Sequence, residues 1–394
     1  MARIAFQRLD DHSPFYWGLL GLHALIIVLG LAAAYYMESN GHIVTGMSNG
    51  IVWGTPHVFA VFLIVAASGA LNVASVSSVF NRLEYKPYAR LSGILAIALL
   101  VGGLAVLVLD LGRPDRLAVA MTTYNFKSIF SWNIYLYTGF IAIVGAYLFV
   151  MMDRTASRVP SLTKAVGGLA FVWRLILTTG TGSIFGFLVA RDAYDTAVLA
   201  PLFIAASLLY GLAFTVLVLV AMAHETRGDL MGEEMVAKFR GLLFIFALSV
   251  IYFTALYHLT KLYGTKYHGV EAFLLRDGGI YPAVFWLGQV CIGLALPLAI
   301  LHFLRERMAL SLACLLFLIG GLAQMYVIII GGQAFPLDIF PGMQVSSSFG
   351  DGAITPYRPS LPELMLGVSG VSVAMLITGL AVKLMPFLPN PMNE

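Results

Sequence analysis

The chain has 394 residues, of which 60% are hydrophobic and only 11% are charged. Soluble domains carry about 25% charged residues, so this composition, with a mean hydropathy of +0.89, excludes a water-soluble fold. The net charge of +3 comes from scattered residues and provides no basic face for a nucleic acid. We therefore expect an integral membrane protein.

Transmembrane helices are predicted from apolar runs, because a helix needs about 20 apolar residues to cross a bilayer. The runs are continuous rather than alternating, so we expect an all-α polytopic fold without membrane-spanning strands. About ten runs are present, at residues 15–36, 51–79, 90–111, 128–151, 165–190, 196–223, 240–263, 280–303, 309–332 and 361–387. The longest gap, 333–360, is rich in Pro, Gly and Ser and is predicted to be a loop. The polar start "MARIAFQRLDDHSPF" lacks the pattern of a removable signal peptide.

The charges of the loops orient these helices. If the N-terminus is cytoplasmic, the cytoplasmic segments hold more Lys and Arg than the outer ones, which favours both termini inside. The exception is the outer segment "LGRPDR" with nearby Lys127. This orientation places His57, at the start of the second run, and Asp110, at the end of the third, near the outer surface.

Metal cofactors are not expected in this chain. The two cysteines, Cys291 and Cys314, lie in apolar runs and form no C-x-x-C pair, which argues against an iron–sulfur cluster. No predicted span carries two well-separated internal histidines, which argues against a cytochrome that holds two haems.

Ionisable residues inside a membrane are costly and indicate a pathway or a binding site. Arg174 lies in the middle of a span and needs a carboxylate, several carbonyls or a water-filled cavity, because its guanidinium stays protonated. His23 and His258 are explained equally well by a hydrogen bond to a neighbouring helix. The interface is within reach of four residues near span ends, namely Lys261, His302, His224 and Glu225.

His57 has the chemistry that a quinone head group requires. Histidine donates to a quinone carbonyl and accepts a proton from a quinol hydroxyl. Trp53 and the nearby Tyr124, Tyr135 and Tyr137 are candidates for an aromatic wall and further donors. The alternative is an interfacial aromatic belt beside a structural histidine.

Three stretches resemble the NrfD/PsrC family of integral membrane subunits. They are "WGTPHVFAVFLIVAASGALNVASVSSVFNRLEYKPYARL", "LAVLVLDLGRPDR" and "NFKSIFSWNIYLYTGF", and the likeness extends to the DsrP type within the DsrMKJOP complexes of sulfur metabolism. The resemblance implies two four-helix bundles, at 51–190 and 196–332. Peripheral helices at 15–36 and 361–387 and an outer loop at 333–360 complete the expected arrangement.

The resemblance also implies a function. Relatives bind quinone near the outer face, hold no cofactor of their own and pair there with a ferredoxin-like iron–sulfur subunit. His57 matches the family's histidine, and Tyr135 or Tyr137 matches a tyrosine that lines the site. We therefore expect menaquinone or ubiquinone as substrate and other membrane and cytoplasmic redox subunits as partners, in the cytoplasmic (inner) membrane.

Proton transfer is expected at Asp110, which faces the outside, and along a route to the cytoplasm through Arg174 and His23. Three other hypotheses remain open. One is a secondary transporter for a small anion, with Arg174 as the binding cation. Another is a hydrogenase-type or polysulfide-reductase-type anchor of the same family. The last is an anchor that assembles partners without binding quinone.

Overall fold

The computed structural model describes residues 6–10, 13–123, 125–153, 155–226, 228, 230–337, 340, 343, 345–348 and 350–390. In this part of the chain ten helices are long and apolar enough to cross a membrane, which confirms the predicted all-α polytopic fold. The spans, in chain order, are α1 (Pro14–Asn40), α2 with α3 (Thr55–Ala70, Asn72–Val79), η2 with α4 (Leu83–Tyr88, Ala89–Leu109), α6 (Ile129–Met152), α7 (Pro160–Gly186), α8 (Leu199–Thr226), α9 (Glu233–Tyr263), α11 with η7 and α12 (Ile280–Ala283, Val284–Ala295, Leu296–Phe303), α13 with η8 and α14 (Arg307–Tyr326, Val327–Gly331, Gly332–Ala334), and α15 (Leu361–Leu384).

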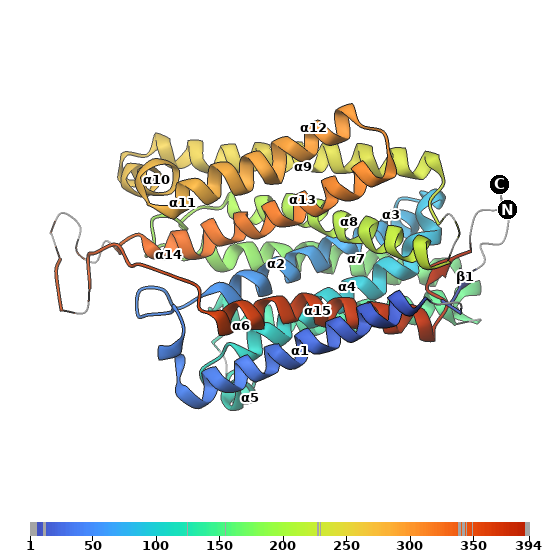
Figure 1. Ribbon diagram of the computed structural model, residues 1–394, viewed down its shortest axis with the longest axis horizontal. Coiled ribbons are helices and arrows are strands. Elements are labelled where there is room, and N and C mark those ends of the chain that lie inside the picture. The colour runs from blue at the N-terminus through green and yellow to red at the C-terminus, as the bar shows by residue number, and fades with distance from the viewer. Residues whose placement is uncertain are drawn as a thin grey trace.

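The remaining elements are short. They are β1 (Phe6–Gln7), η1 (His42–Val44), η3 (Pro114–Arg116), α5 (Leu117–Thr122), η4 (Ala156–Arg158), η5 (Thr265–Tyr267), α10 (His268–Ala272), η6 (Phe273–Asp277) and β2 (Leu388–Pro389). The helices run between two ends of the molecule (Figure 1). At one end β1 pairs with β2 in antiparallel register, with Phe6 opposite Pro389. We call this the strand end and the opposite one, where α2 begins and α9 finishes, the distal end.

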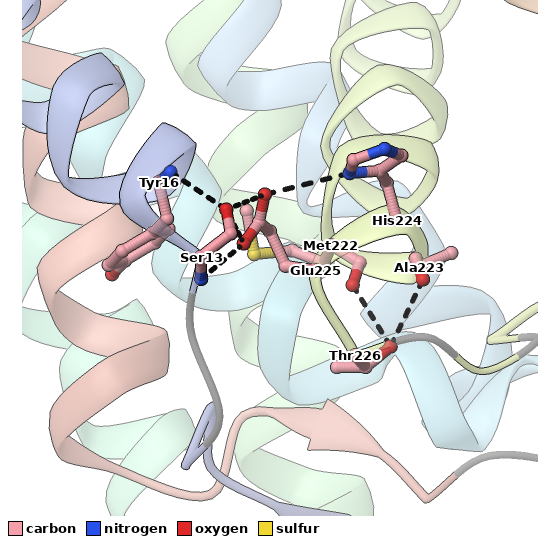
Figure 2. Close-up of polar contacts among 7 residues, drawn as sticks. All are labelled: Ser13, Tyr16, Met222, Ala223, His224, Glu225 and Thr226. Atoms are coloured by element: carbon pink, nitrogen blue, oxygen red, sulfur yellow. Dashed lines mark hydrogen bonds and ion pairs between the residues drawn. The ribbon is translucent and has the colours of Figure 1, made fainter.

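The strand end is fastened by a polar contact between α1 and α8, drawn in Figure 2. Ser13 precedes α1, and its hydroxyl oxygen accepts a hydrogen bond from Tyr16 N at 3.1 Å. The Ser13 amide and hydroxyl both donate to the Glu225 carboxylate, at 3.2 and 2.8 Å to Oε2. A carboxylate at a helix N-terminus is also favoured by the helix dipole.

Helix α2 lies at the centre of the fold. It packs against α4, α7, α8, α13 and α15, whereas α1 packs mainly along α15 and leaves most of its surface exposed. Close approach is possible because α2 has small residues where it meets α8. A Cβ on Gly69 would lie 1.5 Å from Ser207 O, so the two backbones are in direct contact. The central position of α2 brings its first turn to the middle of the distal end.

Candidate quinone site at the distal end

The first turn of α2 carries His57. Gly54 precedes the helix in an extended conformation, and Pro56 occupies the first turn, where its missing N–H removes no helical hydrogen bond. Gly54 has to be small, because a Cβ would lie 2.4 Å from Glu363 Oε1 and 2.9 Å from the Tyr357 hydroxyl. The motif "WGTPH" therefore starts a helix in close contact with chain segments that come much later in the sequence.

An aromatic wall covers His57. Its ring stacks on Trp53, with 5.3 Å between ring centroids and 11° between ring planes. Trp53 also contacts Phe130 of α6 at 5.6 Å and Phe185 of α7 at 5.5 Å between centroids. His57 is half-buried and has no hydrogen-bond partner among the residues that the structure describes. Its ring nitrogens are therefore available to donate to, or accept from, an oxygen of a ligand.

Gln333 of α14 fixes the backbone on either side of Trp53. Its Oε1 accepts hydrogen bonds from Val52 N at 3.0 Å and from Trp53 N at 3.1 Å. Its Nε2 donates to Trp53 O at 3.0 Å and to Ile329 O at 2.8 Å. Because Gln333 is buried and all four bonds reach backbone groups, the Trp53 segment has little freedom to move.

Arg191, between α7 and α8, supports the same frame from the side. It donates to Gln333 O at 2.7 Å and to Gly50 O at 2.9 Å. A planar guanidinium with several donors suits this role, because it binds two carbonyls in fixed directions. The position of the Trp53–His57 stack is thus set by groups from three separate segments.

Tyr357 and Glu363 hold the other side of the turn. Thr55 N donates to the Tyr357 hydroxyl at 2.6 Å, and that hydroxyl donates to Glu363 Oε1 at 2.6 Å. Glu363 Oε2 accepts from Gly46 N and Ser360 N, both at 2.8 Å, the latter as part of a capping box at the start of α15. Burial and the hydrogen bond to Glu363 raise the pKa of Tyr357, so it remains a donor.

Asp110 lies directly after α4, close to this network. It follows Gly103 by seven residues and so shares its helix face, and a Cβ on Gly103 would lie 2.9 Å from Ala60 O of α2. One oxygen, Oδ1, is buried without a hydrogen-bond partner among the described residues. Burial, together with the nearby Glu363 carboxylate, raises the pKa of Asp110 to about 8. Near neutral pH most of this group is protonated.

The candidate tyrosines differ in position. Tyr137 is buried on the inner face of α6 beside Thr181 of α7, whereas Tyr135 is exposed and donates to Met121 O at 2.6 Å. Two residues along a helix correspond to about 200° of rotation, which is why the neighbours point to opposite sides. Tyr124 lies outside the described residues.

Arg174 and His23 lie elsewhere. Arg174 is buried in α7, where Nη2 donates to Asn72 Oδ1 at 2.9 Å, while Nε and Nη1 have no partner in the described part of the chain. His23 lies on α1 with its Nδ1 3.3 Å from Ser372 Oγ of α15. Neither residue contacts His57 or Asp110 in the interactions found among the described residues.

Sequence reasoning missed Gln333, Arg191, Tyr357 and Glu363. A weak signal exists for Gln333, a polar residue that directly follows the apolar run "YVIIIGG". A second signal is "SLPE", in which Ser360 and Glu363 have the spacing of a capping box. Neither pattern indicates that these residues meet the start of α2.

The fold and the distal site define a polytopic helical membrane protein with a half-buried histidine beneath an aromatic wall. The family described as "Polysulphide reductase, NrfD" matches residues 43–337, which is most of the chain. The chain therefore belongs to the NrfD family. The match leaves out α15, so Tyr357 and Glu363 are supplied by a segment beyond it.

Curated relatives are membrane subunits of redox complexes. The chain is 29% identical to the Hdr-like menaquinol oxidoreductase integral membrane subunit of Archaeoglobus fulgidus, over 98% of this chain and 97% of the relative. It is 27% identical to a putative membrane subunit of dimethyl sulfoxide reductase from Halobacterium salinarum, over 94% and 91%. It is also 27% identical to one of the chains of polysulfide reductase from Wolinella succinogenes, over 73% and 96%.

Proposed function

We propose that this chain is the quinone-interacting membrane subunit of a multi-subunit redox complex, with His57 as the residue that contacts the quinone oxygen. The observation that carries the proposal is the state of His57, which is half-buried, stacked on Trp53 and without a hydrogen-bond partner among the described residues. A quinone oxygen needs a donor when oxidised and a proton acceptor when reduced, and histidine supplies both. The menaquinol oxidoreductase relative supports the same chemistry.

Quinol oxidation at this site takes two electrons and two protons from the substrate. One quinol hydroxyl gives its proton to His57, and the second proton goes to Asp110 or to water beside it. The electrons pass one at a time to an iron–sulfur cluster of a ferredoxin-like partner subunit, which leaves a quinone. The same steps in reverse reduce a quinone to a quinol. Menaquinone and ubiquinone are both suitable substrates.

The remaining site residues take supporting roles in this proposal. Trp53 forms one wall of the site. Tyr137 is the preferred second donor over Tyr135, because it lies on the interior face of α6. A partner subunit docks at the distal end over the segment "LGRPDR", where Arg113 and Asp115 form an exposed ion pair.

The distal end faces the outside of the cytoplasmic (inner) membrane in this account, with both termini in the cytoplasm, as the loop charges favour. The complex acts in dissimilatory sulfur metabolism, as a DsrP-type subunit does, with a polysulfide-reductase-type or hydrogenase-type complex as the alternative. Neighbouring genes distinguish these, since sulfite-reductase genes indicate the first and hydrogenase genes contradict it.

Arg174 supports two further roles. A buried guanidinium with two unpartnered nitrogens suits a proton route to the cytoplasm, joined by His23, or a site for a small anion. Flux of an anion through the isolated chain in liposomes, lost in Arg174→Gln, would favour a secondary transporter. Proton release coupled to quinol oxidation, and lost in the same variant, would favour the proton route.

Binding of a quinone analogue to the purified complex tests the main proposal. We expect His57→Ala to weaken binding at least tenfold, while His224→Ala, which changes an exposed histidine at the strand end, leaves the affinity unchanged. Equal affinity of wild type and His57→Ala, in complexes of normal composition, would contradict the role of His57.

A further inference from the structure

A second buried polar site lies at the distal end between α9 and α10. His258 Nδ1 is 2.7 Å from Glu271 Oε2, and both side chains are shielded, with exposed fractions of 10% and 0%. The His258 ring is enclosed by Tyr257 and Phe285, at 4.7 and 4.9 Å between centroids. At this separation a proton must lie between nitrogen and oxygen, so the pair shares protons as one unit.

Glu271 has an unused hydrogen-bonding atom. Its Oε1 is buried and has no partner among the described residues. A carboxylate oxygen without a donor is costly in a buried environment, which favours completion by a water molecule or by a proton. The arrangement therefore differs from an ion pair in which every atom is already bonded.

A small cavity adjoins His258. Its volume is about 10 Å³, close to what one water molecule requires. Its polar lining residues are Thr254, Tyr257, His258, Gln289 and Gln324. The Gln289 side chain is 3% exposed and has no hydrogen-bond partner among the described residues, so its amide is free to bind a water molecule.

Unusual helical geometry surrounds this cavity. The π-helical segments η6, η7 and η8 supply Leu274, Gln289, and Val327 with Ile328 to its wall. The long segment η7 ends just before Pro297, which has no N–H for a regular helical bond. Wider turns of this kind occur mainly at functional sites.

Charged groups connect the pair to the distal surface. Lys261 is 1% exposed rather than extended to the interface, and its ammonium donates to Asp192 O and Asp195 O. The Tyr267 hydroxyl donates to Asp195 Oδ2 at 2.9 Å. The titratable groups around the pair are Tyr257 and Lys261 on α9, Tyr194, Asp192 and Asp195 before α8, and Lys266 and Tyr267 on η5. The polar side chains that η7 and α13 contribute to the cavity are amides.

We propose that His258, Glu271 and Gln289 form a proton-binding site that holds one water molecule and takes up a proton from the distal surface. The incoming hydronium ion gives its proton to Glu271 Oε1, which forms an O–H bond and leaves a water molecule. His258 keeps its hydrogen bond to Oε2, and the Gln289 amide holds the water. The site is separate from His57, and its titration requires no quinone and no electron donor.

An infrared pH titration of the full chain in lipid nanodiscs tests this proposal. Protonation of Glu271 adds a carboxylic acid carbonyl band, which shifts in D₂O if water reaches the group. We expect the wild type to show this pH-dependent band and Glu271→Gln to lose it. Glu225→Gln is the matched control, because Glu225 is also buried beside a histidine but is hydrogen-bonded to Ser13 through both oxygens.

Gln289→Leu keeps Glu271 and removes the partner of the water. We expect its titration midpoint to shift relative to wild type, with helicity and size-exclusion profile unchanged, which also covers the case in which Glu271→Gln fails to fold. A wild-type spectrum without a pH-dependent acid band at Glu271, or a Gln289→Leu midpoint equal to that of wild type, would overturn the proposal.

Discussion

A buried glutamate beside a histidine occurs at each end of the molecule, in two different states. At the strand end both oxygens of Glu225 accept hydrogen bonds from Ser13, and His224 is 78% exposed. At the distal end Glu271 has one oxygen bonded to His258 and one without a partner among the described residues. The first arrangement joins α1 to α8, whereas the second leaves capacity for a proton or a water molecule.

The same contrast extends to other side chains. Buried side-chain atoms without a hydrogen-bond partner occur in five described residues, His42, Asp110, Asn133, Arg174 and Glu271. All except Arg174, which lies midway along α7, are at the distal end. Unsatisfied buried polar groups cost stability unless a ligand, water or partner completes them. We infer that the strand end holds the helices together and that the distal end carries the chemistry.

The largest expected effect of a substitution is at His57. Loss of the proton acceptor in His57→Ala should lower quinol-linked electron transfer of the assembled complex by about 100-fold or more, the usual contribution of a general base. Steady-state rates with a soluble electron acceptor measure this. His224→Ala at the strand end should keep the wild-type rate, and equal losses in both variants would break the contrast between the two ends.

Gln333→Leu should have the next largest effect. The change leaves two amides and a carbonyl beside Trp53 without their partner, each at a cost of about 1–3 kcal/mol, so the Trp53–His57 stack loosens. We expect KM for quinol to rise about tenfold and the thermal midpoint to fall. Gln7→Leu, which removes a single bond at the strand end, should leave KM unchanged. A normal KM in Gln333→Leu would show that the frame does not position the site.

Asp110→Asn should alter the pH dependence. Asp110 accepts a proton only when ionised, and its pKa is about 8, so the wild-type rate should rise with pH through about 8. The variant should lack this inflection and be slower by a few-fold. The raised pKa also means that wild type loses stability relative to Asp110→Asn as pH rises from 3.8 to about 8. Identical pH–rate profiles would remove Asp110 from the proton path.

The smallest effect on activity is expected from Glu225→Ala. Removing the carboxylate leaves Ser13 and the start of α1 without their partner, at a cost of about 1–3 kcal/mol in stability. Thermal unfolding should report this cost while quinol-linked electron transfer stays at the wild-type rate. A large loss of activity in a folded Glu225→Ala complex would show that the strand end also takes part in function.

The helices were predictable from sequence, and most of the site was not. Continuous apolar runs define spans because the bilayer fixes their length, and His57 is recognisable as a histidine at the start of one. Gln333 reaches Trp53 across 280 residues and Tyr357 reaches Thr55 across 302, and no local pattern predicts such pairs.

Burial could not be predicted from position along a helix either. Lys261 and Glu225 were expected to extend to the interface, and this was wrong, since both are buried and hydrogen-bonded within the protein. His258 was expected to bond a neighbouring helix and instead pairs with Glu271 on α10. In each case the partner lies in a loop or a short helix, whose course apolar runs do not determine.

The central claim is that quinone binds at His57, and labelling with a photoreactive quinone analogue tests it most directly. In the assembled complex, mass spectrometry should find the label on the peptide that contains Trp53 and His57, or on the neighbouring start of α6, and excess natural quinol should prevent it. Competed labelling confined to the outer surface of α9, around Ser249 and Tyr252, or to the strand end would contradict the claim.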